Sequence, residues 1–275
     1  MLPISVIIAT LNEENNIAQC LDSVKANNPS EIIVIDGGSS DKTVSIAMIK
    51  GANVIEVEKL GVAYQQQVGI ETAKNPYIAI VDAFDRLEYN CLSILLDELN
   101  ANQFDAIQAF IAIDMPTSYC QKAYAYNATH TLNVSVPEKT IMCGRPAIFK
   151  SEVIKKVGFD WKNFVIGMGC VDTDISIRLE MNGYSQGKGT GVSHRNIPLS
   201  FITWIEKMVK YGKGDALLIK KYPQKKWSIR KHQLFTYPIE RSCRVFLKGG
   251  ALYIPFFILF GYIRYIVSIT WRKNI

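Results

Sequence analysis

Polar residues that suit ligand binding follow three apolar runs in the first third of the chain. The runs cover residues 4–9, 32–35 and 78–81, and the segments after them read Thr10-Leu11-Asn12, Asp36-Gly-Gly-Ser-Ser-Asp41 and Asp82-Ala-Phe-Asp85. In open α/β sheets, ligands bind outside the carboxyl ends of the strands. Each segment taken alone is also an ordinary turn sequence. The three together predict one ligand-binding edge.

Two common phosphate-binding motifs are missing from these segments. No G-x-G-x-x-G follows the first apolar run, which argues against a dinucleotide site. The run from Gly37 to Thr43 looks like a P-loop, but Asp41 stands where the glycine before the lysine is required. A P-loop nucleotide hydrolase is therefore not expected.

The elements that must position these residues follow an alternating pattern. Short β-branched runs end near residues 9, 36, 57 and 82, and stretches with helical spacing, such as 17–24 and 62–73, lie between them. This alternation predicts a mostly parallel sheet with helices on both faces. The chain of 275 residues is 48% apolar and 20% charged, which excludes a disordered protein. We expect one domain over 1–200 and a helical extension over 201–275.

The ordered motifs resemble those of family-2 glycosyltransferases. Besides the three segments above, the stretches 144–160 and 169–184 are similar to that family's acceptor-side segment and its Glu-Asp helix motif. The resemblance covers roughly residues 4–220. It implies the Rossmann-like A-type glycosyltransferase fold, a nucleotide-diphosphate sugar donor and an inverting transfer of the sugar to a hydroxyl acceptor.

The resemblance also implies a role for individual residues. The donor's nucleoside is expected at the Thr10-to-Glu13 loop, which includes Leu11, and at Asp36, which would accept a hydrogen bond from the base. Asp82 matches the first acid of the Asp-x-Asp motif, near the ribose and the metal. Asp172 matches the aspartate of the Glu-Asp pair and is the expected general base.

Two departures from the family pattern concern the metal and the base. Phe84 stands at the second acid of Asp-x-Asp, and Val171 replaces the glutamate beside Asp172. Mg²⁺ or Mn²⁺ prefers carboxylate oxygens and would neutralise the leaving diphosphate. The predicted ligands are Asp82 and Asp85, and the resemblance adds His194, which matches a histidine that in some relatives reaches the metal or the diphosphate. Asp85 also fits a loop acid, and His194 also fits a structural histidine. Without a metal, Lys or Arg side chains would stabilise the diphosphate.

The last part of the chain is basic and apolar. Residues 203–275 hold 15 Lys/Arg and 3 Asp/Glu, whereas residues 1–202 hold 16 and 22. Residues 201–221 have the spacing of a basic amphipathic helix, which fits either a membrane surface or a helix packed on its own domain. The apolar segment 251–271 is almost long enough to cross a bilayer, but Arg264 inside it would cost about 2.5–3.5 kcal/mol. We expect this segment to lie in the membrane plane or to re-enter it.

These observations predict a membrane-attached glycosyltransferase that acts in cell-surface glycan assembly. Its partners would be a nucleotide-diphosphate sugar, a lipid-linked or glycan acceptor and the cytoplasmic face of the cell membrane. Nucleic acid is not an expected partner, because the basic residues border an apolar segment. The alternative hypothesis is a nucleotide-sugar-binding scaffold with little or no activity, which the replacements at Phe84 and Val171 motivate.

Overall fold

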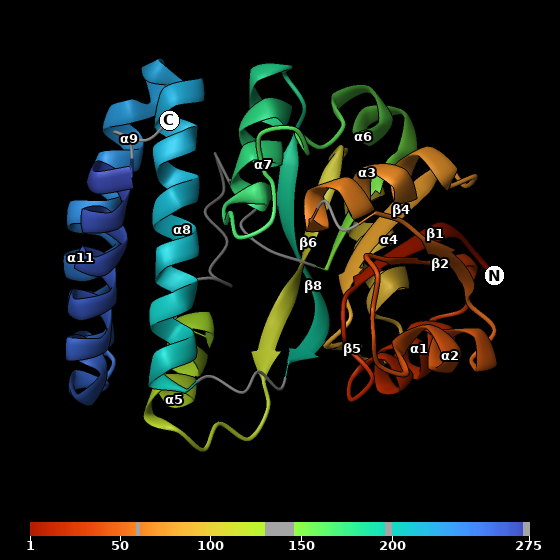
Figure 1. Ribbon diagram of the computed structural model, residues 1–275, viewed down its shortest axis with the longest axis horizontal. Helices are drawn as coiled ribbons and strands as arrows, with labels where there is room; N and C mark the ends of the chain where they lie inside the picture. The colour runs from red at the N-terminus through yellow and green to blue at the C-terminus, as the bar shows by residue number, and fades with distance from the viewer. Residues whose placement is uncertain (59–60, 130–145, 196–199, 272–275) are drawn as a thin grey trace. The chain divides into compact units, whose positions relative to one another are not determined.

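The computed structural model describes residues 1–58, 61–129, 146–195 and 200–271. The chain divides into two compact units (Figure 1). The first takes in Met1–Ala112, Ser135–Ile166 and Asp172–Asn196, and the second takes in Ile113–Val134, Gly167–Val171 and Ile197–Ile275. The second unit thus includes two segments from before residue 200. Each unit has its own apolar core.

The first unit is built on one mixed sheet. Its strands are β1 (Leu2–Thr10), β2 (Pro29–Asp36), β3 (Asn53–Glu56), β4 (Tyr77–Asp82), β5 (Asp85–Leu87), β6 (Ala106–Ile113), β7 (Ala147–Lys150) and β8 (Gln186–Arg195). Their order is β3-β2-β1-β4-β7-β6-β8-β5. The α/β class is confirmed, and the first four strand ends fall within one residue of those predicted.

The sheet is less parallel than the alternation suggested. Strands β3, β2, β1 and β4 pair in parallel, whereas β7 pairs antiparallel with both β4 and β6, and β5 pairs antiparallel with β8. Parallel neighbours require a crossover connection, which the helices between β1 and β4 supply. The pattern of apolar runs predicts strands but does not give their direction beyond that region.

Helices flank the sheet of the first unit. They are α1 (Ile17–Ala26), α2 (Thr43–Ile49), α3 (Val62–Thr72), α4 (Cys91–Ala101), α6 (Ser151–Val157) and α7 (Val171–Met181). In Figure 1, α3 lies on one side of β1 and β2, and α1 and α2 lie on the other. Ile4, Val6 and Ile8 pack into the core with α1, because alternate residues of a strand face the same side. Ile7 faces α3 at Gly69, where an added Cβ would stand 2.4 Å from its Cγ2 atom.

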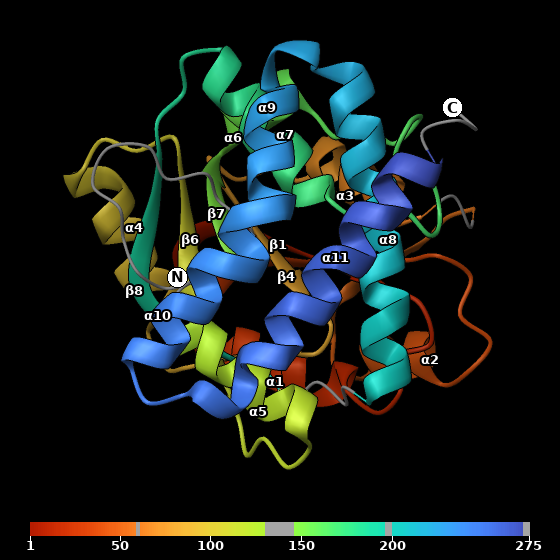
Figure 2. The same ribbon diagram turned by 90° about the vertical axis from the view of Figure 1, so that its left-hand side faces the viewer.

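The second unit consists of helices. They are α5 (Tyr119–Asn127), α8 (Phe201–Lys221), η2 (Pro223–Lys225), α9 (Lys226–Lys231), the π-helical η3 (His232–Glu240), α10 (Arg241–Leu247), η4 (Ala251–Tyr253) and α11 (Ile254–Trp271). Figure 2 shows α8 and α11 next to each other. The two helices come close together at Gly212, where an added Cβ would lie 2.7 Å from the carbonyl oxygen of Arg264. The core between them holds Trp204 and Met208 with Phe256 and Phe260.

Candidate active site

Three of the predicted site residues lie at one edge of the sheet. In the register of the parallel strands, Thr10 is opposite Asp36, and Ala9 is opposite Asp82. The carboxyl ends of β1, β2 and β4 therefore present a hydroxyl and two carboxylates side by side. This edge is where open α/β sheets bind their ligands.

Asp36 is fully buried and holds the loop that follows β2. Its Oδ2 atom accepts the backbone N–H of Gly38 (2.9 Å) and of Ser39 (2.7 Å). Its Oδ1 atom accepts the hydroxyls of Thr10 (2.9 Å) and Ser39 (2.5 Å). A carboxylate has about four acceptor positions, so these bonds account for all of them. Gly38 has a φ of 85°, a conformation that favours glycine, which lets the chain turn back onto the carboxylate.

The loop after β1 is joined to the loop after β2 by further hydrogen bonds. Asn12 donates its N–H to Ser39 Oγ (2.8 Å), and its Oδ1 atom accepts the N–H of Ser40 (2.9 Å). Glu13 donates its N–H to Thr43 Oγ1 (2.7 Å). Burial raises the pKa of the Glu13 carboxyl, although its hydrogen bond with Asn16 opposes that change. The two loops form one polar rim that includes the half-buried Leu11.

A buried glutamine on α3 is hydrogen-bonded to the backbone at the ends of β1 and β2. Gln65 donates its side-chain amide to the carbonyl oxygens of Thr10 (2.7 Å) and Ile35 (2.8 Å). The same helix anchors the segment after α6, because Phe159 donates its N–H to Gln67 Oε1 (2.7 Å). Gln65 was not predicted, since a glutamine within a helix has no local sign of what it binds.

Asp82 and Asp85 share one guanidinium group. Arg195 donates Nε–H to Asp85 Oδ1 (2.6 Å), and its Nη2 atom lies 3.1 Å from both Asp85 Oδ2 and Asp82 Oδ2. The guanidinium carbon is 5.2 Å from the centre of the Phe84 ring. Asp85 is fully buried, and burial raises its pKa to about 7 although Arg195 acts to lower it. Arg195 was also missed by sequence reasoning.

His194 lies beside another acid. Its Nε2 atom is 2.7 Å from Glu88 Oε1. In the β5–β8 ladder, His194 is opposite Arg86, whereas Arg195 is opposite Asp85. Successive residues of a strand point to opposite faces, so His194 and the Arg195–Asp85 pair lie on different faces of these strands.

Asp172 lies in the first turn of α7 and is half-buried. The preceding Val171 is buried. Two residues further on, Asp174 forms an ion pair with Arg178 (2.9 Å), as the four-residue spacing predicts. Arg178 also donates to the carbonyl oxygen of Val157 (2.6 Å), so the Asp174 pair fixes the helix within the first unit. Asp172 is not part of that pair.

The side chains at the Asp82–Asp85 pair do not fit a divalent ion. Among the residues that the structure describes, no three His, Cys, Asp or Glu side chains gather as a metal site. Both Asp85 oxygens bond to Arg195, the Phe84 ring flanks the guanidinium, and His194 bonds to Glu88. An ion shared by Asp82 and Asp85 would have to replace the guanidinium. The metal role of Asp82, Asp85 and His194 therefore stays a prediction.

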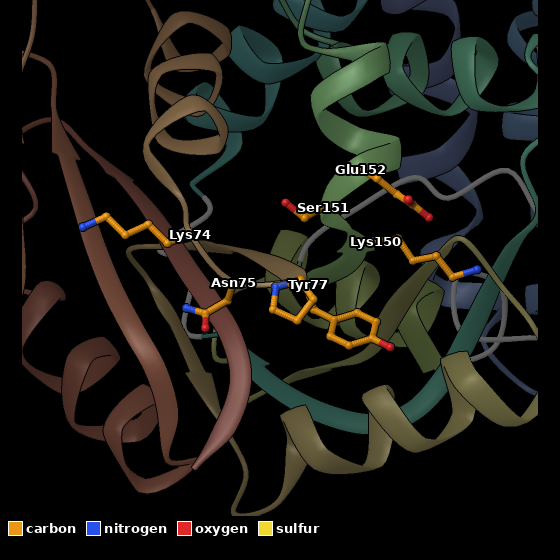
Figure 3. A pocket seen from close by; sticks show the side chains of 7 residues that line it. Lys74, Asn75, Tyr77, Lys150, Ser151 and Glu152 are labelled. Atoms are coloured by element: carbon orange, nitrogen blue, oxygen red, sulfur yellow. The ribbon is translucent and has the colours of Figure 1, made fainter.

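A separate pocket of about 610 Å³ lies at the other end of β4 (Figure 3). Tyr77, the first residue of β4, lines it together with Lys74, Asn75, Lys150 and Glu152. Asp82 is the last residue of the same strand. The pocket is thus at the amino-terminal edge of the parallel strands and is not part of the site described above.

The sequence matches the family described as Glycosyl transferase family 2 over residues 5–158, which is more than half of the chain. The protein belongs to this family. A hexosyltransferase of low-salt glycan biosynthesis, Agl6 of Haloferax volcanii, is 36% identical over 37% of this chain and 26% of its own length. An uncharacterised glycosyltransferase of Rickettsia typhi is 40% identical over 32% of this chain and 30% of its own length. The matched part thus spans less than a third of these two relatives.

Solved structures share the fold over nearly the whole chain. The mannosyltransferase PcManGT of Pyrobaculum calidifontis, solved with GDP-Man and Mn²⁺, has a TM-score of 0.69 and 17% identity, covering 98% of this chain and 87% of its own. S. aureus TarS 1-349 has a TM-score of 0.57 and 15% identity, covering 100% and 92%. At these identities the likeness defines the fold, which is the A-type glycosyltransferase fold that the motifs implied.

Proposed function

We propose that the protein transfers a sugar from a nucleotide-diphosphate sugar to a hydroxyl acceptor with inversion at the anomeric carbon. The observation that carries this proposal is the polar edge formed by Thr10, Asp36 and Asp82. Family membership supports the reaction class. The edge is fixed by buried hydrogen bonds before any ligand arrives, which reduces the ordering needed for binding.

Different residues would bind the donor and activate the acceptor. The 10–13 loop and Asp36 would shape the nucleoside site, and Asp82, whose side chain is 17% exposed, would accept a hydrogen bond from the ribose. Asp36 acts mainly through the loop it holds, because its acceptor positions are already used. Asp172 would take the proton of the acceptor hydroxyl. The oxygen then bonds to the anomeric carbon while the sugar–phosphate bond breaks, and the nucleoside diphosphate leaves with the electron pair.

The first experiment measures donor hydrolysis and transfer with a panel of nucleotide sugars, alongside donor affinity by calorimetry. Asp172→Asn should lower turnover about 10²–10⁴-fold, the range for general-base catalysis, with donor affinity retained. Glu180→Gln, an exposed acid later on the same helix, is the matched control and should keep full turnover. Undiminished turnover in Asp172→Asn would remove this residue from the mechanism.

We further infer that the second unit attaches the protein to a membrane, where it would meet a lipid-linked acceptor. Ala251–Trp271 is long and apolar enough to cross a membrane, with a mean hydropathy of 1.8, and only 28% of that window is buried. Its exposed large apolar residues repeat at helical spacing: Ile258, Leu259, Tyr262, Ile266 and Ile269.

Charged residues beside this surface favour an anionic leaflet. Phe246 and Leu247 of α10 are 61% and 79% exposed. They are next to the exposed Arg244 of the same helix and the exposed Lys248, which follows the helix. Apolar side chains with neighbouring cations suit the interface of an anionic membrane, which the cytoplasmic leaflet provides. Arg264 pairs with Asp215 of α8 on the inward side of α11, an arrangement that favours a helix lying in the membrane plane.

Vesicle co-sedimentation tests the attachment. The chain should bind phosphatidylglycerol vesicles more tightly than phosphatidylcholine vesicles, and salt should weaken the difference. Leu247→Glu should reduce binding roughly tenfold or more, from the loss of about 1.5–3 kcal/mol of apolar burial. Ile49→Glu is the control, since Ile49 is 84% exposed in the first unit. Equal effects of both substitutions would remove this surface from the proposal.

A non-catalytic sugar-nucleotide-binding scaffold is the second candidate. Phe84 and Val171 favour it, because each replaces an acid that the family motif carries. The two candidates differ in one result. A scaffold would bind a nucleoside diphosphate but would neither hydrolyse nor transfer any donor of the panel, even with extracts that supply lipid acceptors.

A further inference from the structure

The acidic pair at the end of β4 already has a cation of its own. Arg195 is the last residue of β8 and lies opposite Asp85 in the β5–β8 ladder. Two of its nitrogens bond to the two oxygens of Asp85, and the same Nη2 atom reaches Asp82. Arg195 is 7% exposed, and Asp85 is fully buried. This is the fork geometry in which arginine binds carboxylates most strongly.

Phe84 completes the cation's surroundings. The guanidinium lies 5.2 Å from the centre of the Phe84 ring, within the range of a cation–π contact. An aromatic face suits a planar, weakly hydrated guanidinium. A hydrated Mg²⁺ or Mn²⁺ requires oxygen ligands, which this ring does not supply. The replacement of an acid by Phe84 and the presence of Arg195 are therefore consistent with each other.

We propose that Arg195 is a resident cation that takes the place of a divalent metal at Asp82 and Asp85, so that this chain binds a nucleoside diphosphate without recruiting Mg²⁺ or Mn²⁺. The inference rests on the proposed function, because it concerns the donor of that reaction. Arg195 is a positioning residue: it pairs with both acids, offsets one of their two negative charges and orients the Asp82 carboxylate at the strand edge. Asp85 serves to hold Arg195 and does not reach the donor.

The first test uses the metal alone. Mn²⁺ is titrated into the full chain and followed by its electron paramagnetic resonance signal, which disappears on binding. The wild-type chain should have no Mn²⁺ site that is lost in the Asp82→Asn variant. Arg195→Gln removes this guanidinium from both acids, and it should gain a Mn²⁺ site that a further Asp82→Asn removes. A wild-type Mn²⁺ site that depends on Asp82 would overturn the proposal, whether or not the Arg195→Gln variant folds.

The second test measures nucleotide affinity. Uridine and guanosine diphosphates are titrated into the wild-type chain with EDTA and with Mn²⁺. The dissociation constants should agree within about twofold, because uncoupled ligands leave each other's affinity unchanged. A metal-dependent site would lose at least about fivefold in EDTA, and that result would refute the inference. In Arg195→Gln, nucleotide affinity should become dependent on Mn²⁺, whereas Arg195→Lys, which keeps the charge, should remain independent of it.

These results separate the inference from the proposed function. If no nucleoside diphosphate binds under any condition, the proposed function fails, while the Mn²⁺ titration of the protein alone still reports on Arg195. If nucleotide binds only together with Mn²⁺ at Asp82, the function stands and the resident cation is refuted. Circular dichroism of each variant, compared with the wild type, shows that the measured chain is folded.

Discussion

The ion pair between α8 and α11 is expected to be the most sensitive point of the second unit. Arg264 donates Nε–H to Asp215 Oδ2 (2.5 Å) and Nη2–H to Asp215 Oδ1 (2.6 Å). Gln233 donates its side-chain amide to the same carboxylate (2.7 Å). The two charged side chains are only 12% and 2% exposed. Arg264, which argues against a simple membrane span, thus has a partner inside the unit.

Removing one partner should destabilise the unit far more than removing a surface pair. Asp215→Ala leaves an enclosed guanidinium without its counter-charge, and such changes cost about 3–5 kcal/mol. Arg244 and Glu240 form an ion pair in the same unit, but their side chains are 49% and 46% exposed. Glu240→Ala should therefore cost no more than about 1 kcal/mol.

Urea denaturation in a mild detergent, followed by far-ultraviolet circular dichroism, measures both free energies of unfolding. A double variant, Asp215→Leu with Arg264→Leu, removes both charges and should recover most of the loss, because replacing a whole buried pair with apolar residues is often neutral. If Asp215→Ala costs no more than Glu240→Ala, the pair is not desolvated and the reasoning is wrong. A double variant as unstable as the single one would contradict the reasoning in the same way.

Three further outcomes are expected. Asp36→Ala removes the acceptor of the buried Thr10 hydroxyl and should lower the free energy of unfolding by about 1–3 kcal/mol, with a smaller loss for Asp36→Asn, both measured by urea denaturation. Gly69→Ala places a methyl group 2.4 Å from Ile7 and should cost about 1–3 kcal/mol in the same assay, whereas an unchanged midpoint would show that α3 shifts freely. Burial and two neighbouring arginines lower the pKa of His232 well below 6.5, so the unfolded chain binds the extra proton as the pH falls. His232 should then lower the free energy of unfolding below about pH 6.5 by at most about 1.4 kcal/mol per pH unit, while the raised pKa of Asp85 acts in the opposite direction. The difference between the pH profiles of the wild type and His232→Gln isolates the contribution of His232.

Much of the fold was predictable from local patterns. Alternating apolar runs and helical stripes gave the α/β class, the strand ends at Thr10, Asp36 and Asp82, and the apolar helix near the carboxyl terminus. The Asp174–Arg178 pair has the four-residue spacing that brings two side chains together on a helix. These features depend on short apolar runs and on the helical period of 3.6 residues, which the order of residues along the chain records directly.

The partners of the site residues were not predictable in the same way. Arg195 meets Asp85 and Asp82 across 110 and 113 positions, and Gln65 meets Thr10 across 55. The sequence around an arginine or glutamine does not show whether the side chain lies on the surface or in a buried cluster. The antiparallel pairing of β5 with β8 places Arg195 opposite Asp85, and no local pattern in the sequence records that pairing.

The sequence by itself therefore determined the family, the class of fold and the acids that follow the first strands. The tertiary structure decided the direction of the later strands, the hydrogen bonds that fix Asp36, and the cation that pairs with Asp82 and Asp85. The physical reason is that helix and strand formation depend on neighbours along the chain. Charge balance depends instead on which distant segments the fold brings within about 3 Å of each other.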